Sequence, residues 1–174
     1  MNEEKKPLTL AQALGIAALG AGAFYGANKL YKSLTMKKVL VSFDWEHDRH
    51  YRHLLTAWSE NGKFDIEFED VTPEEIQSND VGRIKAAITQ CIKDATHSLV
   101  IVGPNATTQH PKSREIGHLN WICFETAMSK ALGKKLVVVK VEKSLAAPAE
   151  VMNSGAKWAL SFNFDAIKKA IDEA

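Results

Sequence analysis

Cysteine is scarce in this chain, with two among 174 residues. Cys91 and Cys123 lie in apolar, helix-like stretches and lack the spacing of metal ligands, so we expect buried, reduced thiols and no zinc site. An excess of charge of one sign is also missing, because the formal net charge is +1 and basic residues are scattered among acidic ones. Without a basic field that gathers phosphate backbones, nucleic acid is not expected as a partner.

The composition is that of a globular protein, with 45% hydrophobic and 25% charged residues. A chain of this length accommodates one domain of ordinary size and an appendage. We see no internal repeat, and the only biased segment is at the N-terminus. We therefore expect an N-terminal tail with a membrane anchor over residues 1–36 and one folded domain over residues 37–174.

The N-terminal segment from Leu8 to Ala27 carries no charged residue over twenty positions. At about 1.5 Å per residue, a helix of this length just crosses the core of a bilayer. Its four glycines would each cost about 1 kcal/mol in a water-exposed helix, yet Ala18, Gly22 and Gly26 form a small-xxx-small ridge that lets membrane helices pack closely. The pattern favours a transmembrane helix, which the ridge would allow to self-associate.

Lysines set the expected orientation of this anchor. Four of them follow the apolar segment, at Lys29, Lys32, Lys37 and Lys38, whereas the two that precede it stand beside two glutamates. By the positive-inside rule we expect a single-pass protein of the inner or cell membrane with its C-terminal domain in the cytoplasm. Two alternatives remain, a soluble or partner-bound helix and a signal peptide, although the mixed-charge leader and the missing cleavage site disfavour the latter.

From residue 37 onward, apolar β-rich stretches alternate with stretches of helical periodicity. Two of the expected strands, at residues 97–103 and 134–141, are almost purely apolar, which is typical of strands covered on both faces. The five expected strands are KVLVSF (38–43), FDIEFEDV (64–71), HSLVIVG (97–103), KKLVVVKV (134–141) and KWALSF (157–162). The pattern predicts an α/β fold with a doubly wound, five-stranded parallel sheet of flavodoxin-like type.

In such sheets, ligands bind outside the carboxyl ends of the strands, where the strand order reverses. For the order 2-1-3-4-5 this point lies between the first and third strands, beside the loops at residues 42–48 and 103–118. The helix after the second loop carries one acidic residue, Glu125, four positions after Trp121. Spacing places both on one face near the helix N-terminus, where the dipole favours a carboxylate. We expect Glu125 to face the crevice, and the alternative is a surface glutamate that keeps the helix soluble.

The stretch VLVSFDWEHDRHYRHLLTAW resembles the first sequence box of TIR domains, especially the bacterial TIR-like branch that includes the ThsB proteins of Thoeris antiphage defence. FDIEFEDV, IQSNDVGRIK, ATHSLVIVG, the W-x-x-x-E of Trp121 to Glu125, and KKLVVVKV follow in the family's order. The resemblance covers roughly Lys38 to Ala170 and rests on this combined order, since W-x-x-x-E alone is a weak pattern.

The resemblance implies an activity. Many TIR domains cleave NAD at the nicotinamide–ribose bond with the glutamate of this helix, and some cyclise the ADP-ribose into signalling nucleotides. Glu125 is the counterpart of that catalytic glutamate, NAD would be the substrate, and neither a further cofactor nor a metal is implied. The resemblance also implies self-association through the domain or the anchor, and a downstream effector that senses the nucleotide product. The sequence leaves open whether NAD is hydrolysed or cyclised.

Several other residues are expected to form the substrate site. Phe43 and Trp45 would supply an apolar or stacking wall for nicotinamide or adenine. Ser42, Asp44 and Asp48 would hydrogen-bond ribose or phosphate groups. Trp121 is expected in the core or in the pocket wall.

The sequence HPKSREIGHLN departs from the family, because it makes the approach to the helix longer and more polar than in close relatives. Its basic residues would contact phosphates or be solvated; they are His110, Lys112, Arg114 and His118. The triplet of His47, His50 and His53 is read as a solvated helix face rather than a metal site.

Two other functions are alternatives to NAD cleavage. A TIR domain can act as a non-catalytic scaffold that mediates protein–protein assembly, here at the membrane. A phosphoacceptor receiver shares the fold but needs an aspartate at the end of the third strand, where this chain has VGPN. The leading interpretation is an NAD glycohydrolase or ADP-ribosyl cyclase in antiphage or stress signalling.

Overall fold

The structure is a computed structural model, and it describes residues 36–61, 66–70, 76 and 78–174. The expected anchor at Leu8 to Ala27 lies outside these residues and stays a prediction. Within the described part of the chain, no helix has the length and apolar character needed to cross a membrane.

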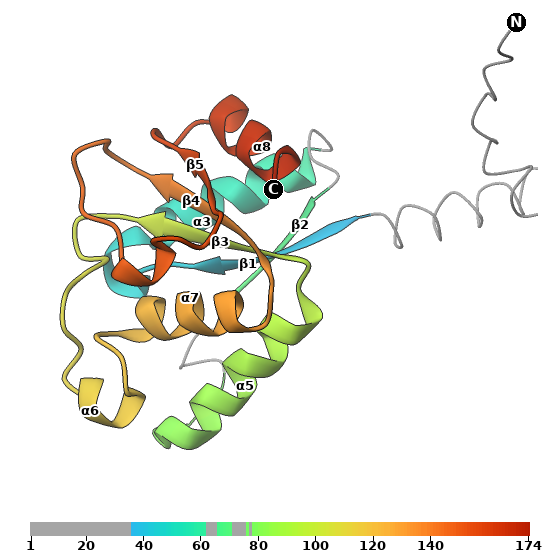
Figure 1. Cartoon of the computed structure of the whole chain (residues 1–174). Helices are drawn as coiled ribbons and strands as arrows, with labels where there is room; N and C mark the ends of the chain where they lie inside the picture. Colours follow the sequence, from blue (N-terminus) through green and yellow to red (C-terminus); the bar gives the residue numbers. More distant parts are fainter. Residues whose placement is uncertain (1–35, 62–65, 71–75, 77) are drawn as a thin grey trace, which may run out of the picture. The chain divides into compact units, whose positions relative to one another are not determined.

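Strands and helices alternate through the described residues, as the hydrophobic pattern predicts (Figure 1). The elements in chain order are β1 (Lys37–Ser42), α3 (Trp45–Glu60), β2 (Ile66–Glu69), α5 (Val81–Asp94), β3 (His97–Val102), α6 (Ser113–Ile116), α7 (Trp121–Ala131), β4 (Lys135–Lys140), the 3-10 helix η1 (Ala149–Val151), β5 (Lys157–Ala159) and α8 (Phe164–Asp172). Side-chain oxygens of Asp44, Asp80, Asn120 and Asn163 cap the N-termini of α3, α5, α7 and α8, which explains where these helices begin.

The five strands form one sheet in the order β2-β1-β3-β4-β5, and every strand pair is parallel. This confirms the predicted flavodoxin-like architecture. The order reverses between β1 and β3, where Val39 pairs with His97 and Ser42 pairs with Val100. The carboxyl ends of these two strands therefore flank the crevice at which ligands are expected.

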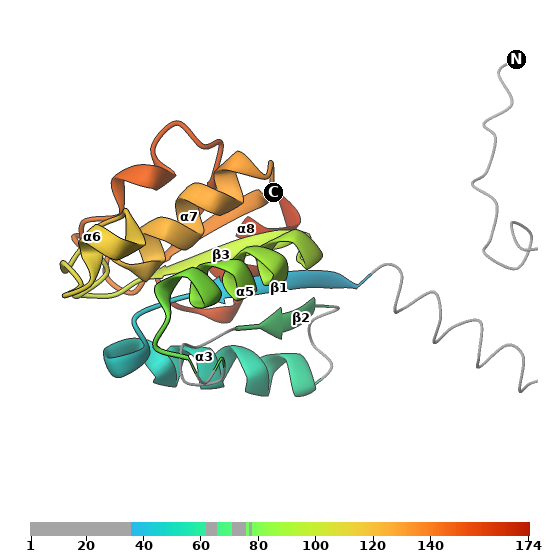
Figure 2. The same ribbon diagram turned by 90° about the horizontal axis from the view of Figure 1, so that it is seen from below.

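Helices cover both faces of the sheet (Figures 1 and 2). Val39 and Val41 belong to the core beneath α3 and α8, which includes Leu55 and Ile167. Leu40 belongs to the core beneath α5 and α7. Because side chains alternate along a strand, Ser42 shares the face of Leu40 and lies on the α5 and α7 side.

Two large apolar side chains are more exposed than their sequence context indicates. Leu54 stands at helical spacing with Trp58, yet it is 45% exposed. The buried side of α3 includes Asp48 and Leu55. Trp158 is 39% exposed because the short β5 lies at the edge of the sheet. Trp58 does pack, with its ring 5.6 Å from that of Phe162.

Candidate active site

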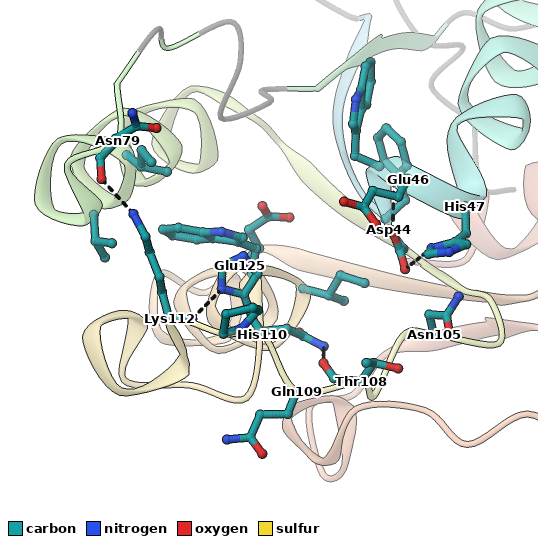
Figure 3. Close-up of a pocket in the computed structure, with 18 of the residues that line it drawn as sticks. Asp44, Glu46, His47, Asn79, Asn105, Thr108, Gln109, His110, Lys112 and Glu125 are labelled. Atoms are coloured by element: carbon teal, nitrogen blue, oxygen red, sulfur yellow. Dashed lines mark hydrogen bonds and ion pairs between the residues drawn. The ribbon is translucent and has the colours of Figure 1, made fainter.

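A pocket of about 730 Å³ opens at the carboxyl end of β1 and is walled by four segments of the chain (Figure 3). The segments are the loop after β1 with the start of α3, the approach to α5 with its first turn, the loop after β3, and the first turns of α7. The lining residues are Phe43, Asp44, Trp45, Glu46, His47, Ser78, Asn79, Val81, Ile84, Asn105, Thr108, Gln109, His110, Pro111, Lys112, Asn120, Trp121, Ile122 and Glu125. The pocket thus lies at the predicted switch point.

Glu125 lies on the second turn of α7 and lines the pocket together with Trp121. The pKa of the Glu125 carboxyl is raised from its ordinary 4.5 to about 7, mainly by burial and in smaller part by the nearby charge of Asp70, while Ser42 acts in the opposite direction. A carboxyl group with this pKa is present in both protonation states near neutral pH. Such a group in a cleft is a candidate for catalysis on physical grounds.

Ser42 lies behind the pocket rather than in its lining, and its side chain is 2% exposed. Its hydroxyl lowers the pKa of the Glu125 carboxyl and so favours the charged form. Among the described residues the hydroxyl oxygen makes no regular hydrogen bond. Ser42 is therefore placed to tune Glu125, and its expected contact with ribose stays a prediction.

Three of the expected binding residues, Phe43, Asp44 and Trp45, line the pocket where β1 leads into α3. The rings of Phe43 and Trp45 are tilted against each other with centroids 5.8 Å apart. The Asp44 carboxylate accepts hydrogen bonds from the Glu46 amide and lies 3.0 Å from Nδ1 of His47. Asp44 therefore both begins the helix and presents negative charge at the pocket edge.

Asp48 is buried, with 2% of the residue exposed, and it is absent from the pocket lining. Burial raises the pKa of its carboxyl, as does the charge of Asp44, while His50 and His47 act in the opposite direction. Its Oδ2 atom has no hydrogen-bond partner among the described residues. The structure places this carboxylate against Gly103, at the root of the loop that follows β3. Its expected role in contacting ribose or phosphate stays a prediction.

Asn120 holds the loop after β3 against the start of α7, a role that the sequence analysis missed. Its Nδ2 donates hydrogen bonds to the carbonyls of Ala106 at 3.0 Å and Thr108 at 2.9 Å. Its Oδ1 accepts a hydrogen bond from the amide of Cys123 and so caps α7. An asparagine just before an apolar helix is a recognisable capping signal, but its two contacts to the loop depend on the fold.

His110 and Lys112, left open between phosphate contact and solvation, both line the pocket. The Lys112 amide donates to Nδ1 of His110 at 3.0 Å, and the Lys112 ammonium donates to the Asn79 carbonyl at 3.1 Å (Figure 3). The other two basic residues of this stretch do not line it: Arg114 is exposed, and His118 lies 3.7 Å from Glu150.

Ser78, Asn79, Val81 and Ile84 form a wall that the sequence analysis did not assign to the site. They precede or begin α5, and Asn79 accepts a hydrogen bond from Lys112 of the loop after β3. Asp80 marks the start of this helix as a capping residue that can be recognised in the sequence. That the segment lies near Glu125 cannot be read from the sequence, because it depends on how the parallel sheet arranges the two helices.

The three histidines of α3 face solvent. His47, His50 and His53 are all exposed, and His47 contacts Asp44. In the part of the chain that the structure covers, no group of three or more His, Cys, Asp or Glu side chains is placed to hold a metal ion.

Comparison with known proteins adds the following. Residues 40–146, more than half of the chain, match the model of the family described as "Thoeris protein ThsB, TIR-like domain". No curated protein matches the chain. A solved structure of a 3-dehydroquinate dehydratase-like protein from Bifidobacterium longum is similar at a TM-score of 0.42 and 17% identity, covering 79% of this chain and 94% of that one.

Proposed function

The chain belongs to the family of the Thoeris ThsB TIR-like domain, and from this premise we propose that it cleaves NAD between nicotinamide and ribose. Glu125 is the proposed catalytic residue. The observation that supports the proposal is the position of this carboxyl group in a pocket at the switch point of the sheet, with a pKa raised by burial to about 7.

The physical role of Glu125 follows from the charge that develops in the reaction. When nicotinamide leaves, positive charge builds on the ribose ring, as it does in glycoside hydrolysis. An ionised carboxylate about 4 Å from that charge, at an effective dielectric near 20, stabilises it by ~4 kcal/mol. A stabilisation of this size corresponds to about three decades in rate.

The proposed reaction breaks one bond and forms another. The bond between the ribose carbon and the nicotinamide nitrogen breaks, and its electron pair leaves with nicotinamide, which becomes neutral. The cationic ribose is then captured by water, which loses a proton and gives ADP-ribose. Alternatively, it is captured by a nucleophilic atom of the same ADP-ribose, which gives a cyclic product.

The pocket walls have proposed roles in binding. Phe43 and Trp45 present aromatic surface to a ring of the substrate, and Trp121 presents a third ring on the side of α7. Asp44 places negative charge near the cationic nicotinamide. Ser42 and Asp48, which lie outside the lining, act indirectly in this proposal, through Glu125 and through the loop after β3.

We further propose that the enzyme works in an assembled form at the membrane. Leu8 to Ala27 would tether the domain, and self-association through the anchor or the domain would bring copies together. A downstream effector would respond to the nucleotide product. With the tether, the self-association and the effector, the enzyme would act in signalling during antiphage or stress responses.

The test is mass spectrometry of nucleotides after full-length protein, clustered on liposomes, is incubated with NAD. Release of nicotinamide together with ADP-ribose identifies a glycohydrolase, and release together with a cyclised ADP-ribose identifies a cyclase. If the clustered wild-type protein consumes no NAD, the proposed activity is rejected and a scaffold role remains.

A further inference from the structure

We propose that Lys112 and His110 form a subsite for the diphosphate group of a dinucleotide, and that this subsite fixes the direction in which the substrate lies. The inference rests on the proposed function and names the part of the substrate that these two residues bind. It starts from the distribution of charge around the pocket.

The charged residues of the pocket are divided between two sides (Figure 3). Asp44 and Glu46 lie on the side of the loop after β1 together with His47, which contacts Asp44, and Lys112 and His110 lie on the opposite side, with Glu125 between the two groups. Of the described residues that line the pocket, Lys112 is the only lysine or arginine. One side of the pocket therefore carries two carboxylates, and the other carries its lysine.

NAD carries the matching asymmetry, because its nicotinamide ring is cationic and its diphosphate is anionic. With nicotinamide beside Asp44 and the ribose at Glu125, the diphosphate would extend toward Lys112. The reverse orientation would bring the diphosphate to the carboxylates and would leave Lys112 without an anionic partner. Like-charge contacts of that kind disfavour the wrong orientation.

The Lys112 ammonium is available for an anion. Its described hydrogen-bond acceptor is the neutral carbonyl of Asn79, and the structure gives it no carboxylate partner within the described residues. An ammonium group has three donors, so Lys112 can keep this bond and still donate to phosphate oxygens. The bond to Asn79 also holds the side chain across the pocket wall.

His110 is oriented by the same turn. Its Nδ1 accepts a hydrogen bond from the Lys112 amide, so Nε2 carries the ring N–H and remains a donor. The backbone amide of His110 donates to the Leu119 carbonyl at 2.9 Å, and the ring lies edge-on to Trp121 with centroids 6.2 Å apart. The Lys112 ammonium and the Nε2–H group of His110 are therefore two hydrogen-bond donors that belong to the same turn.

The experiment compares binding of ADP-ribose and of adenosine to full-length protein by calorimetry. Lys112→Gln should weaken binding of ADP-ribose at least about tenfold, since a charge-assisted hydrogen bond is lost, while binding of adenosine, which lacks phosphates, should change less than about threefold. Lys112→Arg should recover most of the loss. Arg114→Gln is the matched control, because Arg114 is an exposed cation two residues away that does not line the pocket.

The outcomes separate the subsite from the activity. If Lys112→Gln binds ADP-ribose as tightly as wild type, if Arg114→Gln weakens it equally, or if the wild type binds no ADP-ribose, the subsite is rejected, even where NAD is still cleaved. If ADP-ribose binding depends on Lys112 but the clustered wild type cleaves no NAD, the subsite stands and the proposed reaction fails.

Discussion

The carboxylate of Asp48 lies so close to Gly103 that a Cβ atom on Gly103 would sit 2.1 Å from Oδ2 of Asp48. Gly103 follows β3 directly, so this contact fixes where the pocket-forming loop leaves the sheet. Only glycine fits at this position while Asp48 keeps its place.

Gly103→Ala should therefore destabilise the protein by about 1–3 kcal/mol, the usual cost of overpacking a buried site. The measurement is the free energy of unfolding in a double-mutant cycle with Asp48→Ala. Because the clash needs both side chains, the cost of Gly103→Ala should shrink markedly in the Asp48→Ala background. Equal costs in both backgrounds would show that the contact does not constrain the loop.

Asn120→Ala should reduce both stability and substrate affinity. The change removes a helix cap and two hydrogen bonds to the loop after β3, which together stabilise the fold by about 1–3 kcal/mol. The KM for NAD should rise because the loop that carries His110 and Lys112 loses its fixed position.

Asn163→Ala is the control for this prediction, since Asn163 caps α8 through the Ala166 amide and lies outside the pocket. Asn163→Ala should lower the free energy of unfolding by a similar amount and leave the KM for NAD unchanged. If Asn120→Ala kept the wild-type KM, the position of the loop after β3 would have no effect on substrate binding.

The rate of NAD cleavage should depend on pH through Glu125. The charged form is needed to stabilise the cationic ribose, and the pKa of Glu125 is about 7. The value of kcat/KM should rise about tenfold per pH unit below 7 and level off above it. Ser42→Ala removes the group that lowers this pKa, so the profile should move to higher pH.

Ser98→Ala is a suitable control, because Ser98 is also buried but its hydroxyl pairs with that of Ser129 at 2.7 Å. This variant should keep the wild-type profile. A shift of the Ser42→Ala profile to lower pH would contradict the assigned role of Ser42.

The full-length chain should sediment with membranes and should resist extraction by carbonate. The reason is the uncharged segment from Leu8 to Ala27, which is long enough to span a bilayer. A chain starting near Met36 should be soluble and folded, since the alternating pattern is self-contained after that point. Release of the full-length chain by carbonate or by high salt alone would reject an integral anchor.

Much of the fold could be predicted from local patterns. The almost purely apolar strands β3 and β4 indicated a sheet covered on both faces, and the strand order followed from the flavodoxin-like type that the alternation of strands and helices predicts. The position of Glu125 and Trp121 at the crevice followed from the same topology. These predictions succeeded because apolar periodicity is a local property of the chain.

Other features could not be read from local patterns. The burial of Asp48 contradicts the polarity of its side chain, and it arises because the first turn of α3 packs against Gly103. The bond from Lys112 to Asn79 joins loops that are 33 positions apart in the chain. Such contacts depend on which strands become neighbours, so they emerge only with the whole sheet.

Glu125→Gln should yield a folded protein that is at least as stable as wild type at pH 8. The pKa of Glu125 is about 7 in the folded protein, above its ordinary 4.5, so the folded state binds the proton more tightly than the unfolded state. The wild type therefore loses stability as pH rises from about 4.5 to 7, by a total on the order of 3 kcal/mol. Glutamine carries no charge and avoids this loss, which thermal unfolding at pH 5 and pH 8 would reveal.

The rate of NAD consumption by clustered, full-length Glu125→Gln protein is the most direct test of the central claim. Glutamine keeps the shape and hydrogen-bonding capacity of the side chain but removes the charge that stabilises the cationic ribose. The rate should fall on the order of 10²-fold or more, which corresponds to a few kcal/mol at the transition state. Consumption of NAD by this variant at the wild-type rate would contradict the claim and would leave Glu125 as a structural residue of α7.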